Sequence, residues 1–110
     1  MPSRRRVFVS GPYTKGDPCV NTHAAIAAGN GLLDAGLAPF VPHLSHFWHT
    51  VTPRPYEDWM RIDLAWVAVA DAVLRLPGAS TGADRECACA AEHGIPVFHS
   101  VADVVAWSKG

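Results

Sequence analysis

The chain has 110 residues, 49% of them hydrophobic and 17% charged, which fits one compact globular domain spanning residues 1–110. A formal net charge of −1 argues against the basic surface that general nucleic-acid binding requires. Three cysteines without a spacing pattern, no apolar run of about eighteen residues and no signal-peptide core predict a cytoplasmic protein without disulfides or a membrane-spanning segment.

The first predicted element is a strand at residues 7–9, whose side chains are β-branched or aromatic. We interpret the arginine run at 4–6 as a solvated lead-in to this strand, which should be central in its sheet. A loop containing two glycines follows, and then a helix with Asp17 as its N-cap and Pro18 at its first position.

The loop between this strand and this helix is a candidate ligand site. A strand, a glycine loop and a helix N-terminus in that order can present backbone N–H groups to a phosphate or a sugar. Gly11, Tyr13, Thr14 and Lys15 stand at the carboxyl end of the strand, where open α/β sheets bind ligands. The alternative is an ordinary strand-to-helix turn, because no complete phosphate-binding fingerprint is present.

The first helix is expected from residue 18 to residue 35. Ile26, Leu33 and Leu37 are predicted to mark its buried side, and Gly36 its end. The next strand, residues 37–42, contains two prolines, so it should lie at an edge of the sheet.

Three histidines, His43, His46 and His49, recur every three residues in the segment that follows. A metal site is one interpretation, but no carboxylate or cysteine lies close by, and flanking prolines favour a loop. We therefore favour a pocket wall of imidazole and aromatic side chains that would suit a flat base. Phe47 and Trp48 belong to this hypothesis, with core packing as their alternative.

The second half of the chain alternates helices and strands, which predicts an α/β fold with a parallel sheet. The expected elements are a helix at 55–70, a strand at 72–76, a ligand-edge loop at 77–82, a helix, a strand at 95–98 and a helix at 101–108 capped by Ser100.

Two carboxylates occupy helical positions that should face the core. Asp63 shares its stripe with Trp59, Trp66, Val67 and Ala70, and Glu86 shares its stripe with Ala83, Cys87, Ala90 and Gly94. A buried carboxylate without a partner is costly, so two of them predict a site.

Each carboxylate has a structural alternative. A capping box would fall at Asp84 or Ala83, so it does not account for Glu86. Asp63 has an ion-pair alternative, with Arg61, Arg75 or Arg85 as its partner.

The chemistry that fits two acids, a loop for sugar or phosphate and a wall for a base is cleavage of an N-glycosidic bond. Retaining glycosidases place two carboxyl groups about 5 Å apart, one as nucleophile and the other managing protons. Mutual repulsion raises the pKa of one member of such a pair. In this interpretation Glu86 is the nucleophile or base and Asp63 is its partner.

The segment from Asp63 to Ala90 resembles the nucleoside 2-deoxyribosyltransferase superfamily, in particular its branch of 2'-deoxynucleoside 5'-monophosphate N-glycosidases. The matching residues are Asp63-Leu64-Ala65-Trp66, Ala70-Asp71 before a strand, Pro77, Ser80, Gly82, Glu86 and Ala90, with Ser10-Gly11-Pro12 after the first strand. The resemblance implies a Rossmann-like (flavodoxin-like) three-layer sandwich with a four- to five-stranded parallel sheet, a dimer or larger homo-oligomer, and no metal or organic cofactor.

Carried over by position, Glu86 matches the nucleophile of this superfamily and Asp63 the acid near the sugar hydroxyls. Ser80 matches a residue near the 5' phosphate, and His43 matches a histidine after the second strand. Two departures stand out. The tyrosine that the family often places on its first strand is absent, with Tyr13 as a candidate substitute from the loop, and Lys15 stands where the monophosphate branch has an arginine-bearing loop.

We therefore expect an enzyme that cleaves or transfers at the N-glycosidic bond of a nucleoside or nucleoside 5'-monophosphate. The expected substrate-binding residues are Gly11, Tyr13, Thr14, Lys15, His43, Ser80 and Gly82. A non-catalytic nucleotide-binding or sensing module of the same fold is the main alternative. A phosphoribohydrolase with a Pro-Gly-Gly loop is a third, which the single glycine after Pro77 disfavours.

Overall fold

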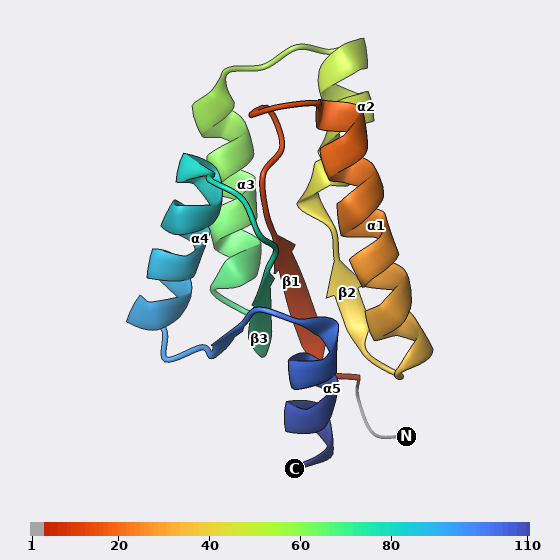
Figure 1. Ribbon diagram of the computed structural model, residues 1–110. Helices are drawn as coiled ribbons and strands as arrows, with labels where there is room; N and C mark the ends of the chain where they lie inside the picture. Colours follow the sequence, from red (N-terminus) through yellow and green to blue (C-terminus); the bar gives the residue numbers. More distant parts are fainter. Residues whose placement is uncertain (1–3) are drawn as a thin grey trace.

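The computed structural model describes residues 4–110 and contains a four-stranded, fully parallel sheet (Figure 1). The strands are β1 (Arg6–Ser10), β2 (Ala38–Phe40), β3 (Ala72–Arg75) and β4 (Val97–Phe98). Their order is β2-β1-β3-β4, so β1 is central and β2 lies at an edge, as the sequence predicts. The register aligns Val7 with Ala72 and Phe8 with Val73, so β1 and β3 end side by side.

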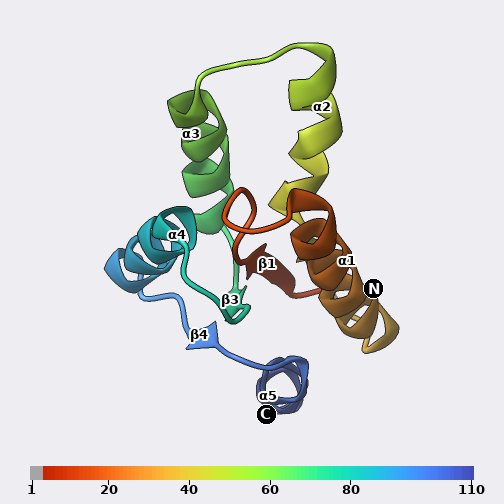
Figure 2. The ribbon, with the colours of Figure 1, turned by 45° about the horizontal axis from the view of Figure 1, so that its top comes forward.

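Helices cover both faces of the sheet. They are α1 (Pro18–Asp34), the short 3-10 helix η1 (Pro42–Leu44), α2 (Ser45–Val51), α3 (Tyr56–Val67), α4 (Thr81–Glu92) and α5 (Val101–Lys109). Figure 2 shows α3 and α4 on one side of the sheet and α1 and α5 on the other. The predicted Rossmann-like three-layer sandwich is thus confirmed.

Alternation along the strands divides the core in two, because successive strand residues point to opposite faces. Val7 and Val9 pack with α1 and α5, whereas Phe8 packs with α3 and α4. Both faces of the sheet are therefore buried, as parallel sheets require.

The buried side of α1 agrees with the prediction at Leu37, which is 4% exposed, but not at the other two residues. Ile26 is 40% exposed and Leu33 52% exposed, whereas Ala25, Ala28 and Leu32 face the core. Small residues bring α1 close to its neighbours, since a Cβ on Gly29 would lie 3.1 Å from Val41. The buried face therefore combines small residues with Leu32, because close packing against the sheet limits how many large side chains fit there.

The segment after β2 is helical and not the predicted loop. η1 begins with a proline at its first turn, and α2 follows it directly. No residue of α2 is buried, and Phe47 is 76% exposed. Trp48 packs edge-on against Trp59 of α3, with ring centroids 5.1 Å apart. A helix this short is marginal by itself, so this tertiary contact outweighs the local proline signal.

Trp66 of α3 also departs from its predicted position. It is 50% exposed and stacks on Phe40 at the sheet edge, whereas Met60 and Val67 are the buried residues of α3.

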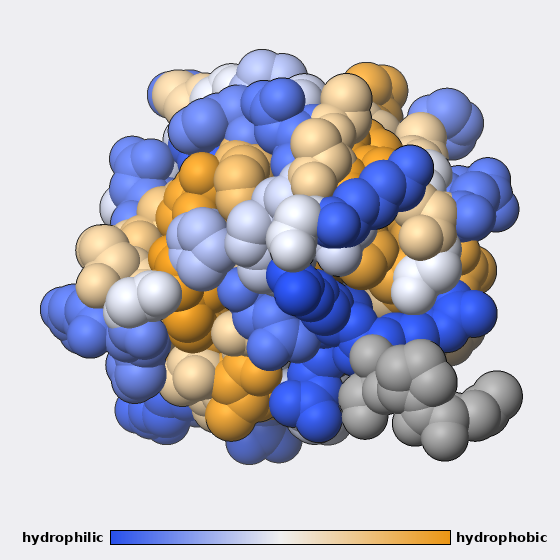
Figure 3. Space-filling model, turned by 90° about the horizontal axis from the view of Figure 1, so that it is seen from below, coloured by the Kyte–Doolittle hydropathy of each residue, from blue (hydrophilic) through white to orange (hydrophobic). Residues whose placement is uncertain are grey.

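The arginines at 4–6 contact residues just before β2, in α5 and just before β3. Arg4 donates to the carbonyl of Leu37 at 3.2 Å, and Arg5 lies over the ring of Trp107. The backbone N–H of Arg6 donates to Asp71 at 2.7 Å. Figure 3 shows the molecule from this end, where hydrophilic residues cover the middle of the surface. None of the helices within residues 4–110 combines the length and hydropathy needed to span a bilayer.

Two adjacent leucines of α1 test the corrected packing. Leu32 is fully buried and Leu33 is half-exposed. We expect Leu32→Ala to lower the free energy of unfolding by about 2–5 kcal/mol, because it leaves a cavity against β1. The matched Leu33→Ala should cost less than about 1 kcal/mol. Urea denaturation followed by circular dichroism measures both, and equal losses would contradict this placement.

Candidate active site

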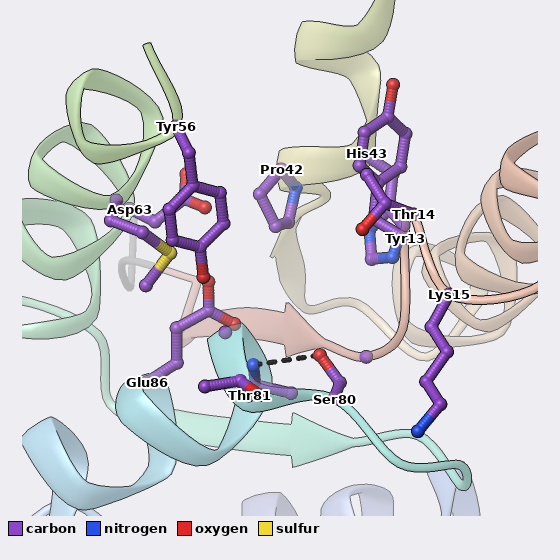
Figure 4. A pocket seen from close by; sticks show the side chains of 14 residues that line it. Tyr13, Thr14, Lys15, Pro42, His43, Tyr56, Asp63, Ser80, Thr81 and Glu86 are labelled. Atoms are coloured by element: carbon purple, nitrogen blue, oxygen red, sulfur yellow. Dashed lines mark hydrogen bonds between the residues drawn. The ribbon is translucent and has the colours of Figure 1, made fainter.

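A cavity of about 280 Å³ opens where β1 and β3 end, at the carboxyl edge of the sheet (Figure 4). All the residues that the sequence proposed for catalysis or substrate binding line it, together with five others. The lining residues are Gly11, Tyr13, Thr14, Lys15, Pro42, His43, Tyr56, Met60, Asp63, Ser80, Thr81, Gly82, Ala83 and Glu86.

Glu86 lies in the second turn of α4 and is only 5% exposed. The hydroxyl of Ser10, the last residue of β1, donates to Glu86 Oε1 at 2.7 Å. Ser10 is fully buried. The sequence did not identify Ser10 as a site residue, because a serine before Gly-Pro reads as the end of a strand. Ser10, and not Tyr13, is thus the hydroxyl-bearing residue that bonds to Glu86.

Two contacts position the start of α4, the helix that carries Glu86. Ser80 is the N-cap and accepts a hydrogen bond from the backbone N–H of Ala83 at 3.1 Å. A Cβ on Gly82 would lie 3.0 Å from the hydroxyl of Tyr56, so glycine allows this tyrosine to approach the helix. Tyr56 was also missed, since its position at the start of α3 indicates only a helix terminus.

Asp63 projects from α3 toward Glu86, and the two carboxyl groups interact directly (Figure 4). The predicted ion-pair alternative for Asp63 is wrong. The three candidate arginines pair elsewhere: Arg61 with Asp58 at 3.1 Å, Arg75 with Asp84 at 3.2 Å and Arg85 with Glu57 at 2.6 Å. Within residues 4–110 no cation forms an ion pair with either acid.

Burial sets the protonation of this pair. It raises the pKa of Glu86 to about 8 and that of Asp63 to about 6. For Glu86, the hydrogen bond from Ser10 acts against this rise and the nearby charge of Asp63 adds to it. Two adjacent negative charges in a low-dielectric site have a high free energy. At neutral pH the pair therefore carries one proton, with Glu86 as its donor and Asp63 as its acceptor.

The loop after β1 is held in place by a side chain of α1. The amide of Asn21 donates to the backbone carbonyls of Tyr13 and Lys15, each at 2.9 Å. The hydroxyl of Tyr13 is hydrogen-bonded to His46 Nδ1 of α2, across the mouth of the cavity. The loop is thus fixed at both its backbone and its tip.

His43 is 4% exposed, and its Nε2 lies 2.9 Å from the carbonyl of Pro12. A carbonyl only accepts, so Nε2 carries the proton. Burial lowers the pKa of His43 below its usual value, which keeps the imidazole neutral. His43 therefore lines the cavity and braces the loop without supplying a positive charge.

A second cavity of about 430 Å³ adjoins the first one and shares five of its residues, Asp63 among them. His46, His49 and Trp59 help to line it, in line with the predicted imidazole and aromatic wall. Phe47 and Trp48 are not among the residues that line this cavity, contrary to that hypothesis.

The imidazoles of the three histidines bond to different residues: that of His43 to Pro12, that of His46 to Tyr13, and that of His49 to both Trp59 and Arg54. In the part of the chain that the structure describes, no group of three or more His, Cys, Asp or Glu residues could hold a metal ion.

Comparison with known proteins gives one family match. Residues 5–99 match the model of a family described as a domain of unknown function, DUF4406. No curated protein matches the chain.

The shared proton predicts how stability depends on pH. In the folded protein the pKa of Glu86 is about 8, against 4.5 for an ordinary glutamate, so folding binds protons between these values. Stability should therefore fall as pH rises from about 4.5 through 8. Glu86→Gln removes the contribution of Glu86, while the raised pKa of Asp63, about 6 against 3.8, keeps its own contribution below about pH 6. We expect the substitution to stabilise the protein by about 2–4 kcal/mol at pH 9 and by little at pH 4.5.

Thermal unfolding of both proteins between pH 4.5 and 9 measures this difference. Glu92→Gln, at the exposed end of α4, is the control and should follow the wild-type curve. A Glu86→Gln curve parallel to the wild-type one would show that Glu86 is ionised in the folded state.

Proposed function

The chain belongs to the DUF4406 family, and from this site we propose that it cleaves or transfers at the N-glycosidic bond of a nucleoside or nucleoside 5'-monophosphate. The supporting observation is the buried Asp63–Glu86 pair, which shares one proton at the carboxyl edge of the sheet. The resemblance of residues 63–90 to the nucleoside 2-deoxyribosyltransferase superfamily supports the same chemistry.

The proton that the two acids share leaves the nucleophile before the attack and is then donated to the leaving group. Glu86 passes its proton to Asp63, and its carboxylate attacks C1' of the sugar. The bond between C1' and the base nitrogen breaks, the electron pair leaves with the base, and Asp63 protonates the base. Glu86 is then esterified to the sugar and Asp63 is ionised.

The second step regenerates the pair. Asp63 takes a proton from water, the hydroxide oxygen attacks C1', and the ester bond to Glu86 breaks with its electron pair returning to the carboxylate. In a transferase, the N–H of an acceptor base would replace the water. The hydrogen bond from Ser10 stabilises the carboxylate form of Glu86 that both steps require.

The start of α4 supports a 5'-phosphate or sugar subsite. Thr81 and Gly82, the first two residues of α4, line the cavity, and backbone N–H groups at a helix start favour anions. Lys15 reaches toward this end of the helix from the opposite loop (Figure 4). This lysine supplies the positive charge that neutral His43 does not.

Glu86 is the direct test of catalysis. We expect Glu86→Gln to reduce the release of free base from a panel of nucleosides and nucleoside monophosphates by at least about 10³-fold, because no nucleophile remains. Glu92→Gln should retain wild-type rates. Chromatography of released base measures the turnover. Unchanged release in Glu86→Gln would rule out the nucleophile. Tight nucleotide binding without release by the wild type would favour the non-catalytic alternative.

We also propose that the protein forms a homodimer through the exposed apolar residues of β2, η1, α2 and the end of α3. Its exposed apolar residues are Phe40, Leu44, Phe47, Trp48, Val51, Trp66 and Val69, each 37–76% exposed. Their combined exposed area is on the order of 700 Å², close to the roughly 800 Å² per partner of a stable interface. A hollow of about 210 Å³ on this face is lined by Phe40, Leu44, Trp48 and Asp63, so a second copy would shield Asp63 from water.

The dimer predicts a mass change on substitution within this face. Wild type should sediment as a dimer at micromolar concentration, and Trp66→Glu should shift it to monomer, because the new charge would lose its hydration in the interface. Val20→Glu, at an exposed residue of α1 outside this face, is the control and should remain dimeric. Analytical ultracentrifugation measures these masses, and a monomeric wild type would contradict the interface.

A further inference from the structure

The larger cavity, here called the base chamber, has a polarity that the proposed reaction does not explain. It is lined by Tyr13, Thr14, His46, His49, Arg54, Tyr56, Trp59, Met60 and Asp63. Asp63 is the only carboxylate among these nine, and it also lines the smaller cavity. Because Asp63 lines both cavities, a sugar whose C1' lies at Asp63 and Glu86 can place its base in this chamber.

The hydrogen bonds of His49 fix its tautomer. The indole Nε1–H of Trp59 donates to His49 Nδ1 at 2.9 Å, and the backbone N–H of Arg54 donates to the same atom at 3.2 Å. An atom that accepts from two donors carries no proton, so the proton of the neutral ring is on Nε2. The polar atom that His49 can offer to a ligand is thus a donor.

Arg54 offers the same polarity. Its Nε donates to Asp58 at 3.0 Å, and its terminal nitrogens have no partner within residues 4–110. Guanidinium nitrogens can only donate. Both His49 and Arg54 therefore have N–H groups available to a ligand in the chamber, while the rings of Trp59 and Tyr13 provide flat apolar surface.

We propose that the base chamber selects bases that turn a carbonyl oxygen toward His49 and Arg54, so that oxo bases such as hypoxanthine and uracil are preferred over amino bases such as adenine and cytosine. This specificity rests on the proposed N-glycosidic function. An exocyclic amino group would meet N–H groups with an N–H group of its own, and the donors would remain unpaired. An oxo base therefore gains hydrogen bonds from His49 and Arg54 that an amino group cannot accept.

His49→Asn tests the role of the imidazole. The Asn oxygen can replace Nδ1 as the acceptor for Trp59 and Arg54, while the distal N–H is lost. We expect wild type to favour hypoxanthine over adenine, and uracil over cytosine, by at least tenfold in kcat/KM for monophosphates with the same sugar. In His49→Asn this ratio should fall severalfold, mainly through slower turnover of the oxo substrates. His23→Asn, on the exposed side of α1, should keep the wild-type ratio.

The possible failures are distinguishable. Equal rates for both classes, a preference for amino bases, or an unchanged ratio in His49→Asn would overturn the chamber's specificity while the proposed function stands. Absence of base release from every substrate would overturn the function alone. Calorimetric binding of the same monophosphates then decides on specificity: at least tenfold tighter binding of the oxo bases supports it, and equal affinities overturn it.

Discussion

The hydrogen bond from Ser10 to Glu86 is the contact on which the site depends, because it joins the central strand to the helix that carries the acid. Ser10 is fully buried and Glu86 is 5% exposed, so the bond is made at the inner end of the cavity, largely out of contact with bulk water. The bond favours an ionised Glu86, whereas burial and Asp63 favour a protonated one. The balance leaves one proton between two carboxyl groups, as acid–base chemistry on a leaving group requires.

The parallel sheet gathers these groups by topology. β1 and β3 are neighbours and end together, so the loop after β1 and the start of α4 face each other across one cavity. α3 crosses before β3 and brings Asp63 to the same edge. Since α2 and α3 extend beyond the sheet, they add a second cavity that continues from the first at Asp63. In this arrangement the acids lie between the proposed sugar and base positions.

Much of this could be predicted from the sequence, and the errors have physical causes. The Asp17 and Ser100 caps, the alternation of strands and helices, and the buried position of Glu86 are local signals, and the structure bears them out. Leu33 and Trp66 are half-exposed although they are large and apolar, because close packing favours small residues on α1 and Trp66 stacks on Phe40 of β2. Ser10 could not be identified, since its importance comes from a contact with Glu86, 76 residues away in the chain.

The most direct measurement of the proposed chemistry is mass spectrometry of the protein quenched in acid during turnover of a nucleoside monophosphate. If Glu86 is the nucleophile, the peptide that contains it will carry the added mass of the sugar phosphate, and the adduct will be absent from Glu86→Gln. Release of base with no adduct on Glu86, or with an adduct on another residue, would contradict covalent catalysis by this pair.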